Sequence, residues 1–325
     1  MDRRSLLKGI GTLSVAGLLN RSTGLSQIIQ EASLSPNKVL RIAHITDMHI
    51  SMDKVALQGV ADCLHHLQSL SIQPDIIFNG GDTINDALLH TKLQVGRQWK
   101  AWNSIYNGEC NLPMETCIGN HDVWGLYTAK KDPMYGKNFA QEMMCLDCRY
   151  KSFDKNGWHF ILLDSTQKKR NGVWYTAKLD EEQMEWLERD LASVPAETPV
   201  MVMSHIPILS AAVFFDKVPV RFGKFHIPGS WMHSDVKEIT ALFDKYPNVK
   251  LCISGHLHLA DHVEYNGVHY YCNGAVCGDW WKEPVYQNTH AGYAIIDLYD
   301  DGSFRHQYLR YDTDEPKAIT SVQGY

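Results

Sequence analysis

Short runs of apolar, β-branched residues alternate along the chain with longer segments whose apolar residues recur every three or four positions. The short runs are typical of buried strands, and the longer spacing is typical of amphipathic helices. This pattern predicts eight strands, at residues 39–45, 75–79, 115–118, 158–163, 200–203, 249–253, 269–272 and 293–298. It predicts four helices, at residues 54–70, 91–106, 179–191 and 234–246.

The order of these elements predicts the fold class. Strands that alternate with helices indicate an α/β fold, and the excess of strands in the later part indicates two packed β-sheets flanked by helices. No linker, repeat or low-complexity tract interrupts the chain after residue 38, so we expect one domain over residues 39–325. In such folds ligands bind where the carboxyl ends of strands meet the following loops.

Composition narrows the range of partners. The formal net charge is -6 and no tract rich in Lys and Arg occurs, which argues against a nucleic-acid polymer as partner. The hydrophobic content of 44% is ample for a sizeable core in a chain of 325 residues. The 16 histidines are many for this length, and a neutral imidazole is a common ligand of transition metals.

Side chains that can bind metals follow five of the predicted strands directly. In chain order they are Asp47, His49, Asp82, Asn120, His205, His256 and His258. Residues two apart in an extended segment point to the same side, so Asp47 and His49 can face one site. A glycine precedes Asp82, Asn120 and His256, which allows a sharp turn. Each motif alone has a plainer explanation as a turn, but five in order at strand ends indicate one shared site.

The series D-x-H, G-D, G-N-H-D, H and G-H-x-H resembles the motif series of the calcineurin-like metallophosphoesterases. Within that superfamily the chain looks most like the bacterial class III cyclic-nucleotide phosphodiesterase group. The resemblance implies a four-layer α/β/β/α sandwich. It also implies two metal ions, one held by Asp47, His49 and His258 and the other by Asn120, His205 and His256, with Asp82 bridging them.

The resemblance also assigns the residues beside the metals. His121 would be the catalytic histidine, and Asp122 is a candidate catalytic partner that fixes its ring. Purple acid phosphatases of this superfamily carry a tyrosine three residues after the bridging aspartate. Asn85 stands there in this chain, so we do not expect a tyrosinate-bound ferric ion.

The predicted function is phosphoester hydrolysis that depends on two divalent transition metal ions, Mn, Fe or Zn. A metal-bound hydroxide would attack a phosphodiester or a phosphomonoester of a small molecule. A nucleotide pyrophosphatase and a phospholipid headgroup hydrolase with the same site chemistry remain open. A non-catalytic metal-binding scaffold is the alternative from another class.

Two long connections, at residues 123–153 and 207–234, are expected to shape the substrate pocket, because loops of this length in a compact domain are usually functional. Trp280 and Trp281 either line the same cleft or pack in the core.

Residues 1–35 have a composition of their own. Arg3 and Arg4, a following Leu-Leu-Lys and a mildly apolar run resemble a twin-arginine export signal. We therefore expect a periplasmic or extracytoplasmic protein and the export machinery as a partner. No later run approaches the roughly 20 apolar residues that span a bilayer, so stable membrane insertion is not expected.

The eight cysteines do not settle the compartment. Cys145 and Cys148 have the spacing of a redox or zinc pair, but no second pair of matching spacing follows them. We expect them to be buried or disulfide-bonded structural residues.

Overall fold

The computed structural model describes residues 36–172, 174–215, 219–312 and 320–324. The predicted export segment at residues 1–35 lies outside the described residues, so its role stays a prediction. Over the described part of the chain, no helix has the length and apolar character needed to cross a membrane.

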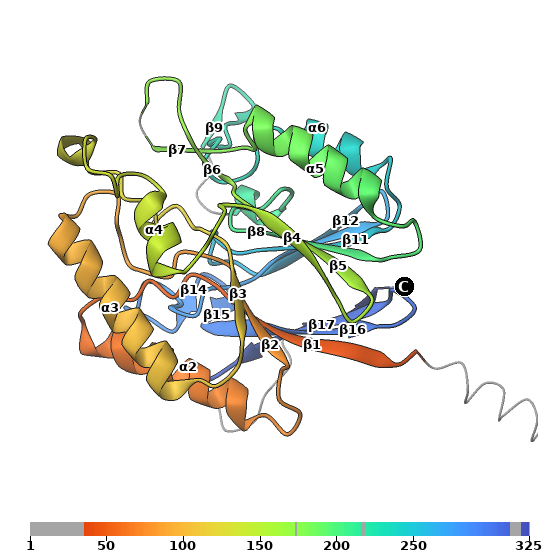
Figure 1. The fold of residues 1–325 in the computed structure, drawn as a ribbon, viewed down its shortest axis with the longest axis horizontal. Helices are drawn as coiled ribbons and strands as arrows, with labels where there is room; N and C mark the ends of the chain where they lie inside the picture. The colour runs from red at the N-terminus through yellow and green to blue at the C-terminus, as the bar shows by residue number, and fades with distance from the viewer. Residues whose placement is uncertain (1–35, 173, 216–218, 313–319, 325) are drawn as a thin grey trace, which may run out of the picture. The chain divides into compact units, whose positions relative to one another are not determined.

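Six strands form the first sheet, in the order β18-β17-β16-β1-β2-β3 (Figure 1). Their bounds are β1 Lys38–Ile45, β2 Ile76–Asn79, β3 Met114–Thr116, β16 Gly292–Tyr299, β17 Phe304–Arg310 and β18 Thr320–Gly324. Strands β1, β2 and β3 run parallel, whereas β16 pairs antiparallel with β1. The carboxyl ends of the three parallel strands therefore meet at one edge.

Six strands also form the second sheet, in the order β12-β13-β11-β8-β5-β4. Their bounds are β4 Lys151–Lys155, β5 Trp158–Leu163, β8 Val200–Ser204, β11 Val249–Ser254, β12 Asp261–Tyr265 and β13 Val268–Cys272. The central strands β5, β8, β11 and β13 are parallel. This sheet also gathers the carboxyl ends of its parallel strands at one edge.

Alternate side chains of each strand enter different parts of the core. Ile42 on β1 and Phe78 on β2 pack between the sheets, in one cluster with Phe160 on β5. Ala43 and Ile45, on the other face of β1, belong to the cluster that contains the helices of the first sheet. This period of two is the pattern of a strand buried on both faces.

Helices cover the outer face of each sheet. Helices α2 Lys54–Ser69 and α3 Lys92–Glu109 pack on the first sheet, and α5 Glu181–Ser193 and α6 Val236–Phe243 pack on the second. The prediction of two packed sheets flanked by helices is confirmed. The start of α3 is fixed by a capping box between Thr91 and Gln94, and the Asp180 carboxylate caps α5.

Several elements escaped the sequence prediction. Among them are β4, β12, β17 and β18, a hairpin of β6 Thr166–Lys168 and β7 Trp174–Ala177, and helix α4 Asn138–Met143. The last lies inside the predicted connection 123–153, with a short 3-10 helix, η1, at Tyr127–Ala129. The connection 207–234 holds η2 Ala212–Phe214 and a hairpin of β9 Val220–Arg221 and β10 Lys224–Phe225. The shortest of these elements bury too few side chains to show a periodic pattern.

The expectation for the cysteine pair is wrong. Cys145 and Cys148 are exposed and unbridged, in the turn that joins α4 to β4, whereas the other six cysteines are buried and free. The pair follows a helix of only six residues, so the segment turns on the surface instead of entering the core.

Candidate active site

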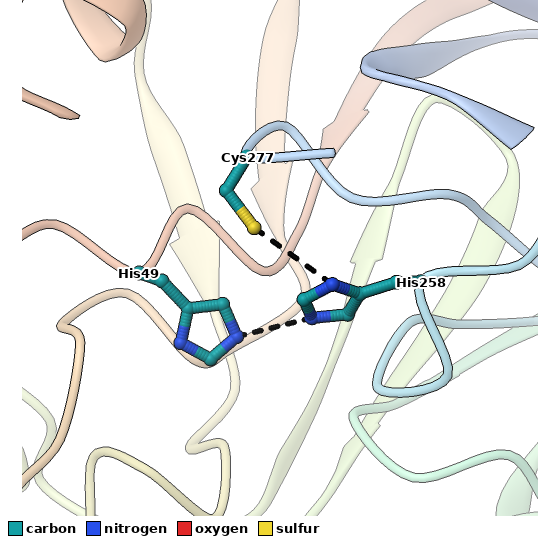
Figure 2. Close-up of side chains that lie close together, drawn as sticks. All are labelled: His49, His258 and Cys277. Atoms are coloured by element: carbon teal, nitrogen blue, oxygen red, sulfur yellow. Dashed lines mark hydrogen bonds between the residues drawn. The ribbon is translucent and has the colours of Figure 1, made fainter. Parts of the chain in front are cut away.

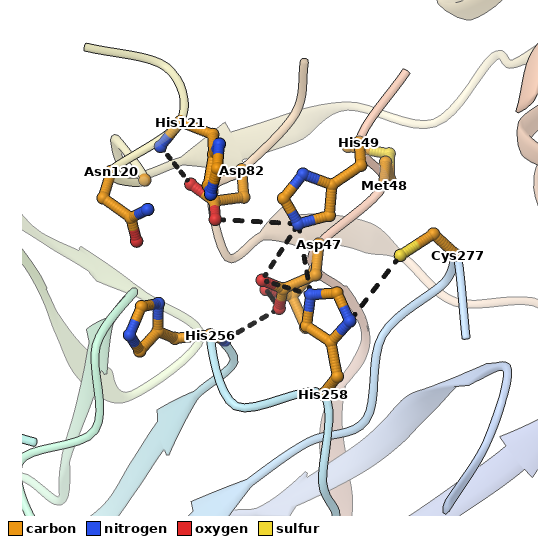
Figure 3. A network of polar contacts seen from close by, with 12 residues as sticks. Asp47, Met48, His49, Asp82, Asn120, His121, His256, His258 and Cys277 are labelled. Carbon is orange, nitrogen blue, oxygen red and sulfur yellow. Dashed lines mark hydrogen bonds and ion pairs between the residues drawn. The ribbon is translucent and has the colours of Figure 1, made fainter. Parts of the chain in front are cut away.

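The predicted metal-binding side chains lie together at the carboxyl ends of strands from both sheets (Figure 3). Asp47 and His49 follow β1, and Asp82 follows β2. His205 comes directly after β8 in the second sheet, and His256 follows β11. The two sheets therefore contribute to a single cluster, as the strand-end pattern predicts.

The turns that bring these side chains inward are conformationally unusual. Five residues of the cluster have a positive φ, namely Asp47 (53°), His49 (42°), Asp82 (48°), His256 (74°) and His258 (57°). Such a backbone is sparsely populated for residues other than glycine and costs of order 1–3 kcal/mol at each position. Strain of this kind persists where the surrounding structure enforces it, which is common at functional sites.

Two glycines allow the backbone to approach the cluster closely. A Cβ atom on Gly119 would lie 2.1 Å from both the backbone nitrogen and Oδ1 of Asp82. A Cβ atom on Gly255 would lie 2.3 Å from Oδ2 of Asp47. Real Cβ atoms do not tolerate such contacts, so only glycine fits at these two positions.

One group of potential ligands consists of Asp47, His49 and His258. The Nε2 atoms of His49 and His258 are 3.1 Å apart (Figure 2). His258 Nε2 is also 3.5 Å from Asp47 Oδ1 (Figure 3). His49 and Asp47 are both fully buried, and Asp47 Oδ1 has no hydrogen-bond partner among the described residues. Asp47 and His49 also form, with Asp82, a buried group whose ligand atoms all lie within 4.8 Å of one another and could hold a metal ion.

A second group consists of Asn120, His205 and His256, with Asp82 between the two groups. His205 Nε2 is 3.1 Å from Asn120 Oδ1 and 3.2 Å from Asp82 Oδ2. The same Asp82 Oδ2 is 3.7 Å from His49 Nε2 in the first group. Asp82 therefore faces both groups, which is the position expected of a bridging carboxylate.

Hydrogen bonds behind the rings fix which nitrogen of each histidine faces the site. Nδ1 of His205 lies 2.8 Å from the Gly80 carbonyl, and Nδ1 of His258 lies 3.0 Å from the Gly278 carbonyl. A carbonyl oxygen only accepts hydrogen bonds, so these Nδ1 atoms carry the proton. When these two rings are neutral, as metal binding requires, their Nε2 lone pairs point at carboxylate, amide or imidazole acceptors.

Acceptors that converge in this way repel one another unless a proton or a cation lies between them. A divalent cation in each group would satisfy all of them at once, so the residues present fit two metal ions. In His256 the nitrogen available to a metal is Nδ1 instead of Nε2, because Nε2 donates to the Ser230 carbonyl at 2.8 Å. Its Nδ1 is buried without a partner among the described residues and is the atom left for a metal.

The four histidines of the cluster divide into two kinds. Burial lowers the pKa of His205, but the Asp82 carboxylate outweighs burial and raises it to about 9, and the pKa of His258 is also raised, so a metal ion would have to displace a proton from each of these rings. Burial lowers the pKa of His49 and of His256 to about 3, which keeps both rings in the neutral form that binds metals. Burial alone would raise the pKa of Asp82, but the neighbouring imidazoles, His205 first, hold it well below its usual range. The carboxylate therefore stays ionised.

His121 lies beside the cluster without joining either group. Its backbone N–H donates to Asp82 Oδ1 at 2.7 Å, and its ring packs edge-on against His49 with centroids 5.0 Å apart. Its Nδ1 is 3.4 Å from Asp86 Oδ1. Burial lowers the pKa of His121, but the carboxylates of Asp82 and Asp86 outweigh burial and raise it above its usual value.

The prediction that Asp122 fixes the His121 ring is wrong. The buried Asp122 carboxylate accepts hydrogen bonds from the backbone N–H groups of Thr83, Ile84 and Gly119. It therefore ties the loop after β2 to the turn after β3, which keeps Asp82 and Asn120 in place. The carboxylate beside the ring is Asp86, four residues after Asp82, which the motif series does not contain.

The two tryptophans have different roles. The Trp280 ring lies over His49, with centroids 3.9 Å apart, and also contacts the rings of His121 and His258. Trp280 therefore forms a wall of the site. Trp281 packs against Gly59 in α2, and its Nε1 donates to the Met48 and His49 carbonyls, so it supports the turn after β1.

Cys277 is a further neighbour that sequence reasoning missed. Its Sγ lies 3.8 Å from His258 Nδ1, on the side of the ring that faces away from His49 (Figure 2). Since that nitrogen donates to the Gly278 carbonyl, Cys277 packs behind a ligand and is not itself placed as one. Cys277 lies 19 residues after His258 and belongs to none of the motifs, so the sequence alone does not predict this contact.

The model of the calcineurin-like phosphoesterase family matches residues 40–260, a stretch that contains the whole cluster. The chain belongs to this family. It is therefore a phosphoesterase, as predicted from the motif series, and members of the family use divalent metal ions. The roles of the individual residues stay predictions, and the geometry shows which atoms of each residue would carry them out.

Curated relatives of this phosphoesterase include two bacterial enzymes. The chain is 23% identical over 305 residues to a 3′,5′-cyclic-nucleotide phosphodiesterase of Nostoc sp., which covers 88% of this chain and 98% of the relative. It is 25% identical over 301 residues to the 3′,5′-cyclic adenosine monophosphate phosphodiesterase CpdA of Escherichia coli, which covers 88% of this chain and 95% of the relative.

A solved structure confirms the fold. A dimetal phosphatase from Danio rerio superposes with a TM-score of 0.61 at 14% identity and covers 89% of this chain and 99% of that chain. At this identity the similarity concerns the fold alone.

Gly119→Ala should disrupt the cluster. The added Cβ would displace the Asp82 carboxylate, and a misplacement of about 1 Å typically costs about 10²-fold in activity. We expect a loss of that size in phosphoesterase activity together with reduced metal content, measured by mass spectrometry of the purified protein. Gly108→Ala is the matched control, because a Cβ at that position in α3 meets no atom within 4 Å. Full metal content in Gly119→Ala would contradict the close-approach argument.

Asp86→Asn should reduce turnover without loss of metal. Asp86 contacts His121 and His90 but no member of the two ligand groups, and partners of this kind are typically worth about 10–100-fold in activity. We expect kcat to fall within that range while the metal content stays that of the wild type. The control is Asp132→Asn, whose carboxylate pairs with Lys92 at the surface. An unchanged kcat in Asp86→Asn would show that Asp86 does not contribute to turnover.

Proposed function

We propose that this phosphoesterase hydrolyses 3′,5′-cyclic nucleotides to nucleoside monophosphates with the help of two divalent transition metal ions. The proposal is supported by the two bacterial relatives, whose names state this activity and whose sequences align over nearly their whole length. The observation that carries it is the pair of ligand groups that share Asp82 and direct unpaired acceptors inward.

The proposed ligand sets follow from these groups. Asp47, His49 and His258 would hold one ion, and Asn120, His205 and His256 the other, with Asp82 between them. Four imidazoles, two carboxylates and one amide oxygen suit Mn, Fe or Zn better than Mg or Ca. When bound, the ions supply positive charge for the phosphoryl oxygens and activate the water that attacks phosphorus.

The protein side chains would complete the reaction. As the oxygen of water bonds to phosphorus, the bond between phosphorus and the departing ester oxygen breaks, and that oxygen needs a proton. His121 would donate it through Nε2, and the contact of its Nδ1 with Asp86 at 3.4 Å supports this role. Proton donation of this kind contributes typically about 10²–10⁴-fold in rate. Trp280 shields one side of the reacting groups from bulk water.

Other phosphoesters fit the same metal chemistry. A phosphomonoester, a nucleotide pyrophosphate and a phospholipid headgroup each present a phosphoryl group that two metals can bind. The cyclic nucleotides are preferred because both bacterial relatives are named for them.

The test is an activity panel on protein of defined metal content. Protein stripped with a chelator should be inactive, and added Mn, Fe or Zn should restore hydrolysis of cyclic AMP, measured as AMP by chromatography. His121→Ala should lower kcat by at least about 10²-fold with the metal content retained. If activity is restored on p-nitrophenyl phosphate or a pyrophosphate, but not on any cyclic nucleotide, the proposed substrate is wrong.

We further propose that the protein is exported by a twin-arginine route and acts outside the cytoplasm. The proposal rests on Arg3, Arg4 and the apolar run that follows them. Fractionation of cells that express the full chain should find it outside the cytoplasm, and Arg3→Lys with Arg4→Lys should retain it inside. An unchanged distribution of the double variant would refute the proposal.

A further inference from the structure

A cavity that His121 lines has no role so far. It measures about 370 Å³, a size typical of small-molecule sites. His121 and Asp86 line one part of it. Tyr127, Tyr135, Trp174 and Lys130 line other parts. A molecule in this cavity would therefore touch the proposed proton donor directly.

Three aromatic side chains and Lys130 line this cavity, and Lys168 contacts two of the aromatic rings without lining the cavity itself. The Nζ atom of Lys130 lies 3.9 Å from the centroid of the Tyr127 ring. The Nζ atom of Lys168 lies 5.1 Å from the Tyr135 ring and 5.0 Å from the Trp174 ring. The cavity thus combines flat apolar surfaces with positive charge, which suits a planar ring that belongs to an anionic molecule.

Trp174 contributes a hydrogen-bond donor that lacks an acceptor. Its indole Nε1 is buried and has no hydrogen-bond partner among the residues that the structure describes. Buried donors in native proteins almost always have a partner, and the N–H of a tryptophan usually finds one. A molecule bound in the cavity, which Trp174 lines, can supply such an acceptor.

Two large hydrophobic side chains at this cavity are exposed. Tyr127 is 75% exposed and Leu89 is 80% exposed, although both line the cavity. A ligand against them would bury part of this apolar surface. The surface is available because Tyr127 lies in the connection after β3, outside the packed layers.

We propose that this cavity binds the heterocyclic base of a nucleotide phosphoester whose phosphate lies between His121 and the metal ligands. A nucleobase offers a flat face for Tyr127 and Tyr135 and a ring nitrogen or carbonyl that accepts from Trp174 Nε1. A lipid headgroup offers no planar ring for these walls. The proposal rests on the proposed function and names the part of the substrate that gives it specificity.

The test compares two substrates that differ only in the base. They are cyclic AMP and the 3,5-cyclic phosphate of methyl β-ribofuranoside, which has the same phosphodiester ring and no base. The metal-loaded enzyme should show a kcat/KM at least about tenfold higher for cyclic AMP, since stacking and one hydrogen bond favour the base. Adenosine should inhibit competitively, whereas methyl β-ribofuranoside should not.

Two variants test whether the preference for the substrate with a base arises in the cavity. Trp174→Phe keeps the aromatic ring and removes the N–H, and Tyr127→Ala removes a mostly exposed ring with little risk to folding. Each should reduce kcat/KM for cyclic AMP at least about tenfold more than for the base-free substrate, mainly through KM. Phe222→Ala is the matched control, because this aromatic side chain is fully exposed and does not line the cavity.

The outcomes separate the two proposals. If both cyclic substrates are hydrolysed equally well, or if the variants affect both equally, the base-binding proposal is wrong and the proposed function stands. If neither cyclic substrate is hydrolysed by the metal-loaded enzyme, the proposed function fails. Adenosine binding, measured by calorimetry, then tests the cavity by itself, and its absence would refute base binding as well.

Discussion

The Asp82 carboxylate is the constraint on which the site depends. It follows β2 in the first sheet, yet its Oδ2 lies 3.2 Å from His205, which follows β8 in the second sheet, and 3.7 Å from His49. Its Oδ1 accepts the backbone N–H of His121 at 2.7 Å, so the same group also positions the proposed proton donor. A single carboxylate thereby couples both ligand groups and the residue beside them.

This coupling requires a fixed separation between the two sheets. Stacked sheets lie about 10 Å apart, and here large side chains such as Phe78 and Phe160 fill the space between them. Across such a gap the ligands meet only if the turns at the strand ends bend sharply inward. Gly119 and Gly255 and the positive φ angles of the ligands provide those bends, so the strain at the cluster is the consequence of joining two sheets at one site.

Much of this arrangement could be predicted from the sequence because it depends on strands. The long apolar runs marked the central strands, and the ends of these strands marked the candidate metal ligands. The features that the sequence did not predict depend on tertiary contacts. Strand β17 carries Arg305 and Gln307 between its buried positions, so it is not a continuous apolar run. Asp86 resembles any loop aspartate, and only the fold brings it to His121. Asp122 was misjudged because the motif series shows its position in the sequence and not the direction of its side chain, whereas its carboxylate turns towards backbone N–H groups. The choice of Nδ1 in His256 likewise depends on the Ser230 carbonyl.

The same inter-sheet geometry extends to the part of the molecule that would choose the substrate. Tyr127 belongs to the connection after β3 of the first sheet, whereas Trp174 lies on the β6–β7 hairpin that follows β5 of the second. The cavity that they line is therefore built, like the metal cluster, from both sheets. Because Tyr127 lies on a connection and Trp174 on the small β6–β7 hairpin, outside the two main sheets, both can change without disturbing the ligands. In the proposed complex the two main sheets would thus fix the distance between phosphate and base, while the residues of the connections and the hairpin would decide which base fits.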